Sequence, residues 1–213
     1  MDQLDQITAI IAAAMGAAWA SGINLYAAIL VLGLLGATGH ADLPAGLQIL
    51  MNPLVLSFAA VMYLVEFFTD KIPGIDSAWD AIHTFIRIPA GALLAAGAFT
   101  HQGSAITLAA AMLGGGLAAS SHGAKTGTRI MINTSPEPVS NWVASVSEDM
   151  AVVAGLWTAL HHPLLFLFCL ALFLILFFWL LPRLWRHGKS GFASWRHVFG
   201  RGHKKRFPGQ NRL

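Results

Sequence analysis

The sequence predicts an all-α polytopic membrane protein of about six transmembrane helices, arranged in two related halves. Its 213 residues are 56% hydrophobic and only 11% charged, and the mean hydropathy is +0.63. Soluble domains contain about 25% charged residues, so this composition is typical of a membrane protein. Apolar segments long enough to cross roughly 30 Å of hydrocarbon recur along the chain. The two halves are indicated by a motif, Pro-x-x-x-Ser-x-Trp-x-Ala, that begins at Pro73 and again at Pro136; a parallel and an inverted relation both fit it.

The first expected helix covers residues 7–37 and is longer than a bilayer requires. It is interrupted by Ser21-Gly22-Ile23-Asn24. Either the helix is tilted and kinked at the glycine, or two half-helices meet near Ser21–Asn24, as in many transporters. The predicted fold has the first helix broken near Ser21–Asn24. The sequence leaves open whether the segment crosses the membrane once or folds back as a re-entrant hairpin. Asn24 is a candidate site residue.

The remaining spans are bounded by polar connectors and turn residues. Pro53 suits the first turn of the second span, and Pro89 predicts a kink in the third. The expected spans after the first are 53–69, 76–99, 104–121, 140–160 and 163–181. Residues 1–182 are thus predicted to form the transmembrane domain, and residues 183–213 a basic tail with nine Lys or Arg and no Asp or Glu.

The positions of the basic residues predict the orientation. Cytoplasmic segments are enriched in Lys and Arg, so the tail, Lys71, Lys125 and Arg129 are expected on the cytoplasmic side of the membrane. Six crossings then place both termini in the cytoplasm. The tail is expected to adhere to anionic lipid headgroups, and its charge is accounted for without nucleic acid. Whether the chain forms a homo-oligomer is left open.

The segment Glu66–Arg87 carries the side chains best suited to chemistry. Glu66 and Asp70 are four residues apart, so one helix places both carboxylates on the same face. A second stripe, with spacings of four, three and four on the next helix, consists of Asp76, Asp80, His83 and Arg87. A charge inside a membrane costs about 2.5–3.5 kcal/mol on insertion scales, so such a cluster is expected to be functional.

Two further acids, Glu148 and Asp149, lie inside the fifth span and are expected to join this ion pathway together with Asn24. Such a set of groups suits proton relay or the binding of a divalent cation. The candidate metal ligands are Glu66, Asp70, Asp80 and His83. A purely structural charge network that holds the helices together is the alternative.

Residues 122–139 are expected to form a second polar connector. Lys125 and Arg129, with the hydroxyl and backbone amide groups between them, resemble an anion-binding loop for a phosphate or a lipid headgroup. A solvated cytoplasmic loop is the alternative reading. The glycine and lysine spacing of a P-loop is absent.

Three segments together resemble a family of small bacterial multi-pass membrane proteins classified only as a domain of unknown function. They are Ser21–Tyr26, Glu66–Gly91 and Asn133–Trp142, and the resemblance extends over about residues 10–160. It implies a multi-pass helical membrane protein and brings no activity with it.

The sequence therefore favours a membrane transporter or channel-like protein for a cation or a small polar solute, with proton coupling through intramembrane carboxylates. It contains no nucleophile–His–Asp arrangement, no CxxC pair and no HExxH motif, so an enzyme is not expected. The alternative is a non-transporting membrane scaffold or a lipid-headgroup-binding protein in which the charges are structural. The transported species is not determined by the sequence.

Overall fold

The computed structural model of the chain describes residues 3–72, 74–133 and 138–199. All regular structure in these residues is helical, with bounds α1 Gln3–Ala37, η1 Ala45–Met51, α2 Pro53–Thr69, α3 Ile75–Ala98, α4 Ser104–Asn133, α5 Pro138–His161 and α6 Pro163–Phe199. Five of these helices are long and apolar enough to cross a membrane, or six if η1 and α2, which meet at 67°, form one bent span. The predicted all-α membrane fold is confirmed. The chain divides into two compact units, residues 1–171 and 172–213.

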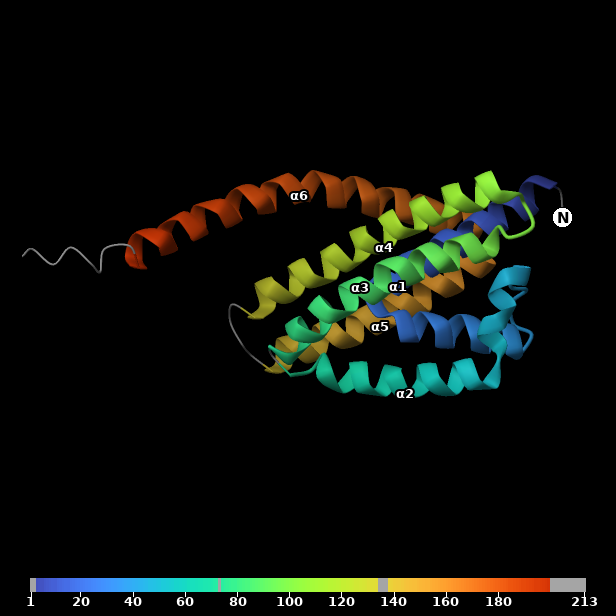
Figure 1. Cartoon of the computed structure of the whole chain (residues 1–213), viewed down its shortest axis with the longest axis horizontal. Helices are drawn as coiled ribbons and strands as arrows, with labels where there is room; N and C mark the ends of the chain where they lie inside the picture. The colour runs from blue at the N-terminus through green and yellow to red at the C-terminus, as the bar shows by residue number, and fades with distance from the viewer. Residues whose placement is uncertain (1–2, 73, 134–137, 200–213) are drawn as a thin grey trace, which may run out of the picture. The chain divides into compact units, whose positions relative to one another are not determined.

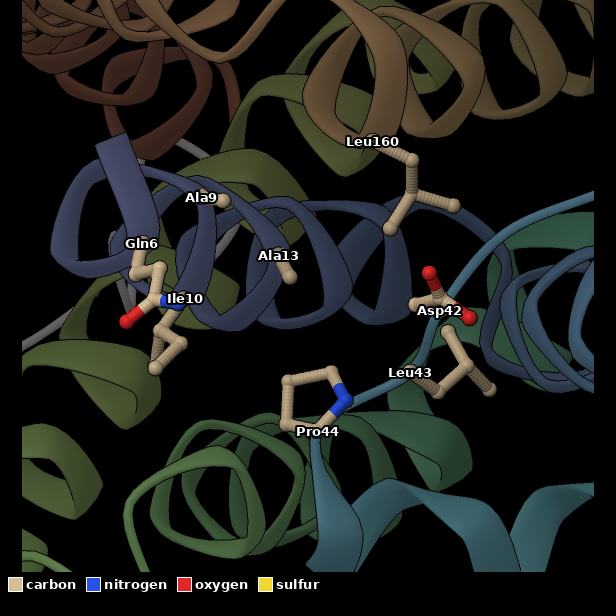
Figure 2. Close-up of a pocket in the computed structure, with 8 residues that line it drawn as sticks. All are labelled: Gln6, Ala9, Ile10, Ala13, Asp42, Leu43, Pro44 and Leu160. Atoms are coloured by element: carbon tan, nitrogen blue, oxygen red, sulfur yellow. The ribbon is translucent and has the colours of Figure 1, made fainter. Parts of the chain in front are cut away.

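Helix α1 is broken at Asn24 and folds back on itself. Asn24 has non-helical backbone angles, φ −147° and ψ 100°. Gln6, near the start of α1, lines the same cavity as Pro44, just beyond its end, and Leu160 of α5 (Figure 2). Both ends of α1 therefore lie at one end of the helix bundle, and Asn24 forms the tip of a re-entrant hairpin, drawn in two shades of blue in Figure 1. The predicted break is confirmed, and the segment re-enters.

Small residues let the first half of α1 approach α4 closely, and let α3 approach α4. A Cβ atom at Gly22 would meet Ser121 Oγ and the carbonyl oxygen of Ala118. Between α3 and α4, a Cβ atom at Gly114 would meet the carbonyl oxygen of Gly91 at 2.7 Å. Helices in membranes pack closely where such small residues let the backbones approach. The resulting core is rich in alanine rather than leucine.

The distribution of polarity is that of a membrane protein. On α3, the Phe85 side chain is 83% exposed whereas Arg87, two residues later, is fully buried. Large apolar side chains such as Leu54 and Leu164 also face outward. Hydrocarbon tolerates an apolar exterior, whereas charged groups must be paired inside the protein. The polar interior is consequently the part of the molecule in which a function is to be sought.

The boundaries of α2 and α4 follow from different parts of the sequence. Pro53 begins α2 after Asn52, whose side chain accepts a hydrogen bond of 2.9 Å from the backbone N–H of Leu54. Helix α4 continues to Asn133 and α5 begins at Pro138, so the predicted connector 122–139 is wrong at residues 122–133 and 138–139. Residues 134–137 of that prediction lie outside the described residues. Lys125 and Arg129 lie on the buried face of α4. Their charged groups face other side chains of the protein, so the helix continues through both residues.

The re-entrant α1 changes what the helices imply about orientation. The start of α1 lies at the same end of the bundle as residues 38–52 and 99–103, because a Cβ atom at Gly46 would contact Thr100 at 3.1 Å and Gln6 lies near Pro44. A hairpin does not cross the membrane. The predicted cytoplasmic position of both termini therefore no longer follows from the number of crossings.

Candidate functional site

Seven ionisable side chains from α2, α3, α4, α5 and the connector after α2, six of them buried, form one continuous charge network. Its members are Glu66, Asp70, Asp80, Arg87, Lys125, Arg129 and Glu148. Glu148 is the most exposed of them, at 15% of its side-chain surface. All seven were predicted as site residues, and the structure brings them together.

Lys125 on α4 lies at the centre of this network. Its ammonium nitrogen Nζ is 2.9 Å from Oδ2 of Asp70. It is also 3.5 Å from one oxygen each of Glu66, Asp80 and Glu148. One cation thus contacts four carboxylates that come from three helices and the connector after α2. The sequence of residues 122–139 alone does not reveal this arrangement.

Arg87 joins the acids of α2 and α3. Its Nη2 atom donates to Oε1 of Glu66 at 2.6 Å, and its Nη1 atom donates to Oδ1 of Asp80 at 2.9 Å. Nη1 also lies 3.2 Å from Nδ1 of His122. Since a guanidinium only donates, Nδ1 accepts, and the other ring nitrogen carries the proton and donates to Thr84 Oγ1 at 2.7 Å. His122 is therefore a neutral neighbour of the network.

Arg129, one turn after Lys125, fixes the acid contributed by α5. Its Nε and Nη2 atoms bind the two oxygens of Glu148 at 3.2 and 2.7 Å. This bidentate geometry is the strong form of an arginine–carboxylate pair. Its Nη1 atom donates to the backbone carbonyl of Asp70 at 2.9 Å. The cations predicted as an anion-binding pair are thus both occupied by carboxylates.

The network contains more acid than base. Four carboxylates face three cations, which leaves one negative charge when every group is ionised. In addition, Oε2 of Glu66, Oδ1 of Asp70 and Oδ2 of Asp80 are buried without a hydrogen-bond partner among the described residues. Leaving a buried acceptor unsatisfied costs about 1–3 kcal/mol. These three oxygens are therefore places where a proton or a small cation would be stabilised.

Asn24 and Asp149 form a separate polar contact beside the network. The amide Nδ2 of Asn24 donates to Oδ1 of Asp149 at 3.0 Å, and the hydroxyl of Tyr63 donates to Oδ2 at 3.1 Å. No cationic side chain of the described residues lies within ion-pair distance of Asp149. Tyr63 was missed by the sequence reasoning, although it precedes Glu66 by three residues and so shares its helix face.

Two predicted site residues, His83 and Asp76, lie outside the network. The ring of His83 binds the Tyr26 hydroxyl at 3.3 Å and the carbonyl oxygen of Trp79 at 2.9 Å. Asp76, in the first turn of α3, accepts from Asn133 Nδ2 at 3.0 Å. His83 consequently does not join the three carboxylates with which it was predicted to bind a metal.

The described residues contain no group of three or more His, Cys, Asp or Glu arranged to hold a metal ion. Glu66, Asp70 and Asp80 do converge, but on the side chains of Arg87 and Lys125. The divalent cation therefore stays a prediction from the sequence.

Lys71, in the connector after α2, is the remaining buried cation. It donates to the carbonyl oxygen of Phe67 at 2.9 Å and to Ser145 Oγ at 3.3 Å. Its Nζ atom also lies over the Phe67 ring, a cation–π contact. Burial lowers the pKa of Lys71. Its ammonium is thus bound by a carbonyl oxygen, a hydroxyl group and an aromatic ring, and forms no ion pair with a carboxylate of the described residues.

Comparison with known proteins places these residues in a family. Residues 11–183 match the family model described as Domain of unknown function (DUF4126). No curated protein and no solved structure matches the chain. The matched range contains α1 from residue 11 onward and the whole charge network. The chain is thus a membrane-spanning helical protein that belongs to the DUF4126 family.

Proposed function

We propose that this protein transports a cation across the membrane in exchange for protons, using the charge network as its binding site. The observation that carries the proposal is the position of Lys125, whose ammonium contacts four carboxylates. These oxygens are hard ligands that suit a cation. In the resting protein, the lysine holds the place that a transported cation would take.

The re-entrant α1 supports this proposal. Non-helical backbone at membrane depth is tolerated where it is enclosed by protein or lines a hydrated cavity, and half-helices that meet there build the sites of many transporters. The tip of α1 at Asn24 reaches the centre of α5 through Asp149, the neighbour of Glu148. The tip is therefore placed to change position together with the network.

Competition between protons and cations for the same oxygens would provide the coupling. A proton on Oε2 of Glu66 or Oδ2 of Asp80 neutralises the one excess negative charge of the network. It thereby weakens the attraction of the network for a transported cation. Loss of that proton restores four carboxylates against three cations, and the site again attracts a cation. Both ligands use the same carboxylates, so each one excludes the other.

The second candidate is a scaffold or lipid-headgroup-binding protein in which the network only holds helices together. It is favoured by the fact that Arg87, Lys125 and Arg129 are each already paired with carboxylates. Under either proposal the protein is not an enzyme and lies in the inner membrane of a bacterium. Its basic tail then binds anionic lipid headgroups.

Flux measurements on purified protein in liposomes test the proposal. A pH-sensitive dye inside the vesicles reports proton movement after a gradient of Na⁺, K⁺, Mg²⁺ or Mn²⁺ is imposed in turn. The wild type is expected to move protons with at least one of these ions. Glu66→Gln and Asp80→Asn are expected to abolish that signal, and Asp42→Asn, in an exposed loop, is the matched control.

The stability of the same variants separates the two candidates. Glu66→Gln leaves three carboxylates facing three cations, so the neutral network is expected to keep its fold and unfolding temperature. Loss of flux in a stably folded variant supports transport. Unchanged flux in both acid variants, or no proton movement in the wild type with any of the four ions, overturns the proposal and leaves the structural role.

A further inference from the structure

A groove between α2 and α5 is lined mainly by apolar side chains, with the hydroxyl-bearing Thr158 and one charged side chain, Asp149. Its volume is about 560 Å³, within the usual range for small-molecule sites. Tyr63 and Phe67 of α2 form one wall, and α5 provides the other, including Met150, Val153 and Trp157. Met150 and Val153 are 67% and 50% exposed, so the groove opens to the exterior of the bundle.

Asp149 lies at the middle of its helix, eleven residues after Pro138 and twelve before His161. At 1.5 Å per residue, about 17 Å of helix separates it from either end. This is the depth at which a charge is most costly in a bilayer. Glu148, the adjacent acid, is neutralised by Arg129, whereas Asp149 has no ion-pair partner among the described residues.

The two hydrogen bonds to Asp149 fix its carboxylate in place. Asn24 donates to one oxygen and Tyr63 donates to the other. Both are neutral donors, so they orient the group without cancelling its charge. The N-terminal end of the second half of α1, which begins at Asn24, adds a partial positive charge that also favours a carboxylate there. The negative charge at the groove is thus held ready for an external cation.

We infer that this groove binds a hydrophobic organic cation, with its charge at Asp149 and its apolar body between α2 and α5. The aromatic rings of Tyr63 and Trp157 add to the attraction, because aromatic faces attract cations. An inorganic ion would leave the apolar walls without a partner, and an anion would be repelled by Asp149. The inference does not depend on transport by the charge network, which includes Glu148 of α5 but not Asp149.

Binding of tetraphenylphosphonium to the protein in phosphatidylcholine nanodiscs tests the inference. Tetraphenylborate has nearly the same size and shape with the opposite charge, so it is the matched control ligand. Equilibrium dialysis with each radiolabelled ion in a separate sample is expected to show saturable binding of the cation and none of the borate. Asp149→Asn, which keeps the shape of the side chain, is expected to weaken binding at least tenfold.

Two further variants keep the test decisive. Val153→Trp fills the groove without changing its charge and is expected to reduce binding as strongly as Asp149→Asn, so it replaces that variant if Asp149→Asn fails to fold. Ser147→Ala, on an exposed part of α5, should bind like the wild type. Unchanged affinity in either groove variant, absence of saturable binding in the wild type, or equally strong saturable binding of the borate overturns the inference.

Discussion

The side-chain amide of Asn24 donates a hydrogen bond of 3.0 Å to Asp149, and this contact joins the re-entrant tip of α1 to the centre of α5. The amide oxygen of Asn24 also accepts from the backbone N–H of Ala27 at 3.0 Å. Asn24 therefore caps the second half of α1 and connects it to α5 at the same time. A residue with one donor group and one acceptor group on a short side chain is needed to do both.

Replacement of Asn24 is expected to destabilise the protein in a pH-dependent way. Asn24→Ala should cost about 1–2 kcal/mol from the lost cap. Asn24→Asp keeps the cap but places a second carboxylate against Asp149, so it should be worse at neutral pH and should recover as the pH falls and one acid takes up a proton. Urea unfolding in detergent, followed by tryptophan fluorescence, measures both effects. An Asn24→Asp protein as stable as the wild type at pH 7 would contradict this role.

Arg87 and Glu66 are expected to show strong coupling. Arg87→Met leaves Glu66 and Asp80 buried without their main cation, and removal of one partner of a buried pair costs about 3–5 kcal/mol. The double variant Glu66→Met/Arg87→Met should be more stable than Arg87→Met alone, because it removes one of the stranded acids. A double-mutant cycle on the free energy of unfolding gives the coupling. Additive effects of the two changes would show that the 2.6 Å contact contributes little.

Lys125→Met is expected to make the stability of the protein depend on added cations. Without its ammonium, four carboxylates that now meet at Nζ would repel one another, and a cation in their midst would relieve this. The unfolding temperature of the variant should rise with added Na⁺ or Ca²⁺. Lys71→Met, which removes a buried lysine that binds no acid of the network, is the control. A variant that is insensitive to both ions would argue against a cation site at this position.

Gly22 is expected to tolerate no side chain. A Cβ atom there would meet Ser121 and the backbone of Ala118, so Gly22→Ala should push α1 away from α4 and destabilise the bundle by about 1–3 kcal/mol, as overpacking does elsewhere. Gly116→Ala is the matched control, since nothing lies within 4 Å of its added Cβ atom. It should be neutral or stabilising by about 0.5–1 kcal/mol. Equal unfolding temperatures for the two variants would rule out a tight contact at Gly22.

The amino-acid sequence determined the helix faces and the depth of the charges. The four-residue spacing of Glu66 and Asp70 places both on one face of α2, because an α-helix repeats every 3.6 residues. The interval between Asp80 and Arg87, close to two turns, does the same on α3. The apolar composition required these faces to be buried inside protein. The length of residues 7–37 and their interruption at Ser21–Asn24 indicated a kink or a break there, and left both open.

Only the tertiary structure decided which groups meet. Lys125 and Asp70 are far apart in the chain, and a local pattern does not distinguish a lysine that faces water from one that faces a carboxylate. The polar face of residues 122–133 therefore resembled a loop, although it is a helix whose charges are satisfied by α2, α3 and α5. The direction of α1 after Asn24 likewise depends on Gly22, Ser121 and Asp149, contacts that exist only once the helices have packed.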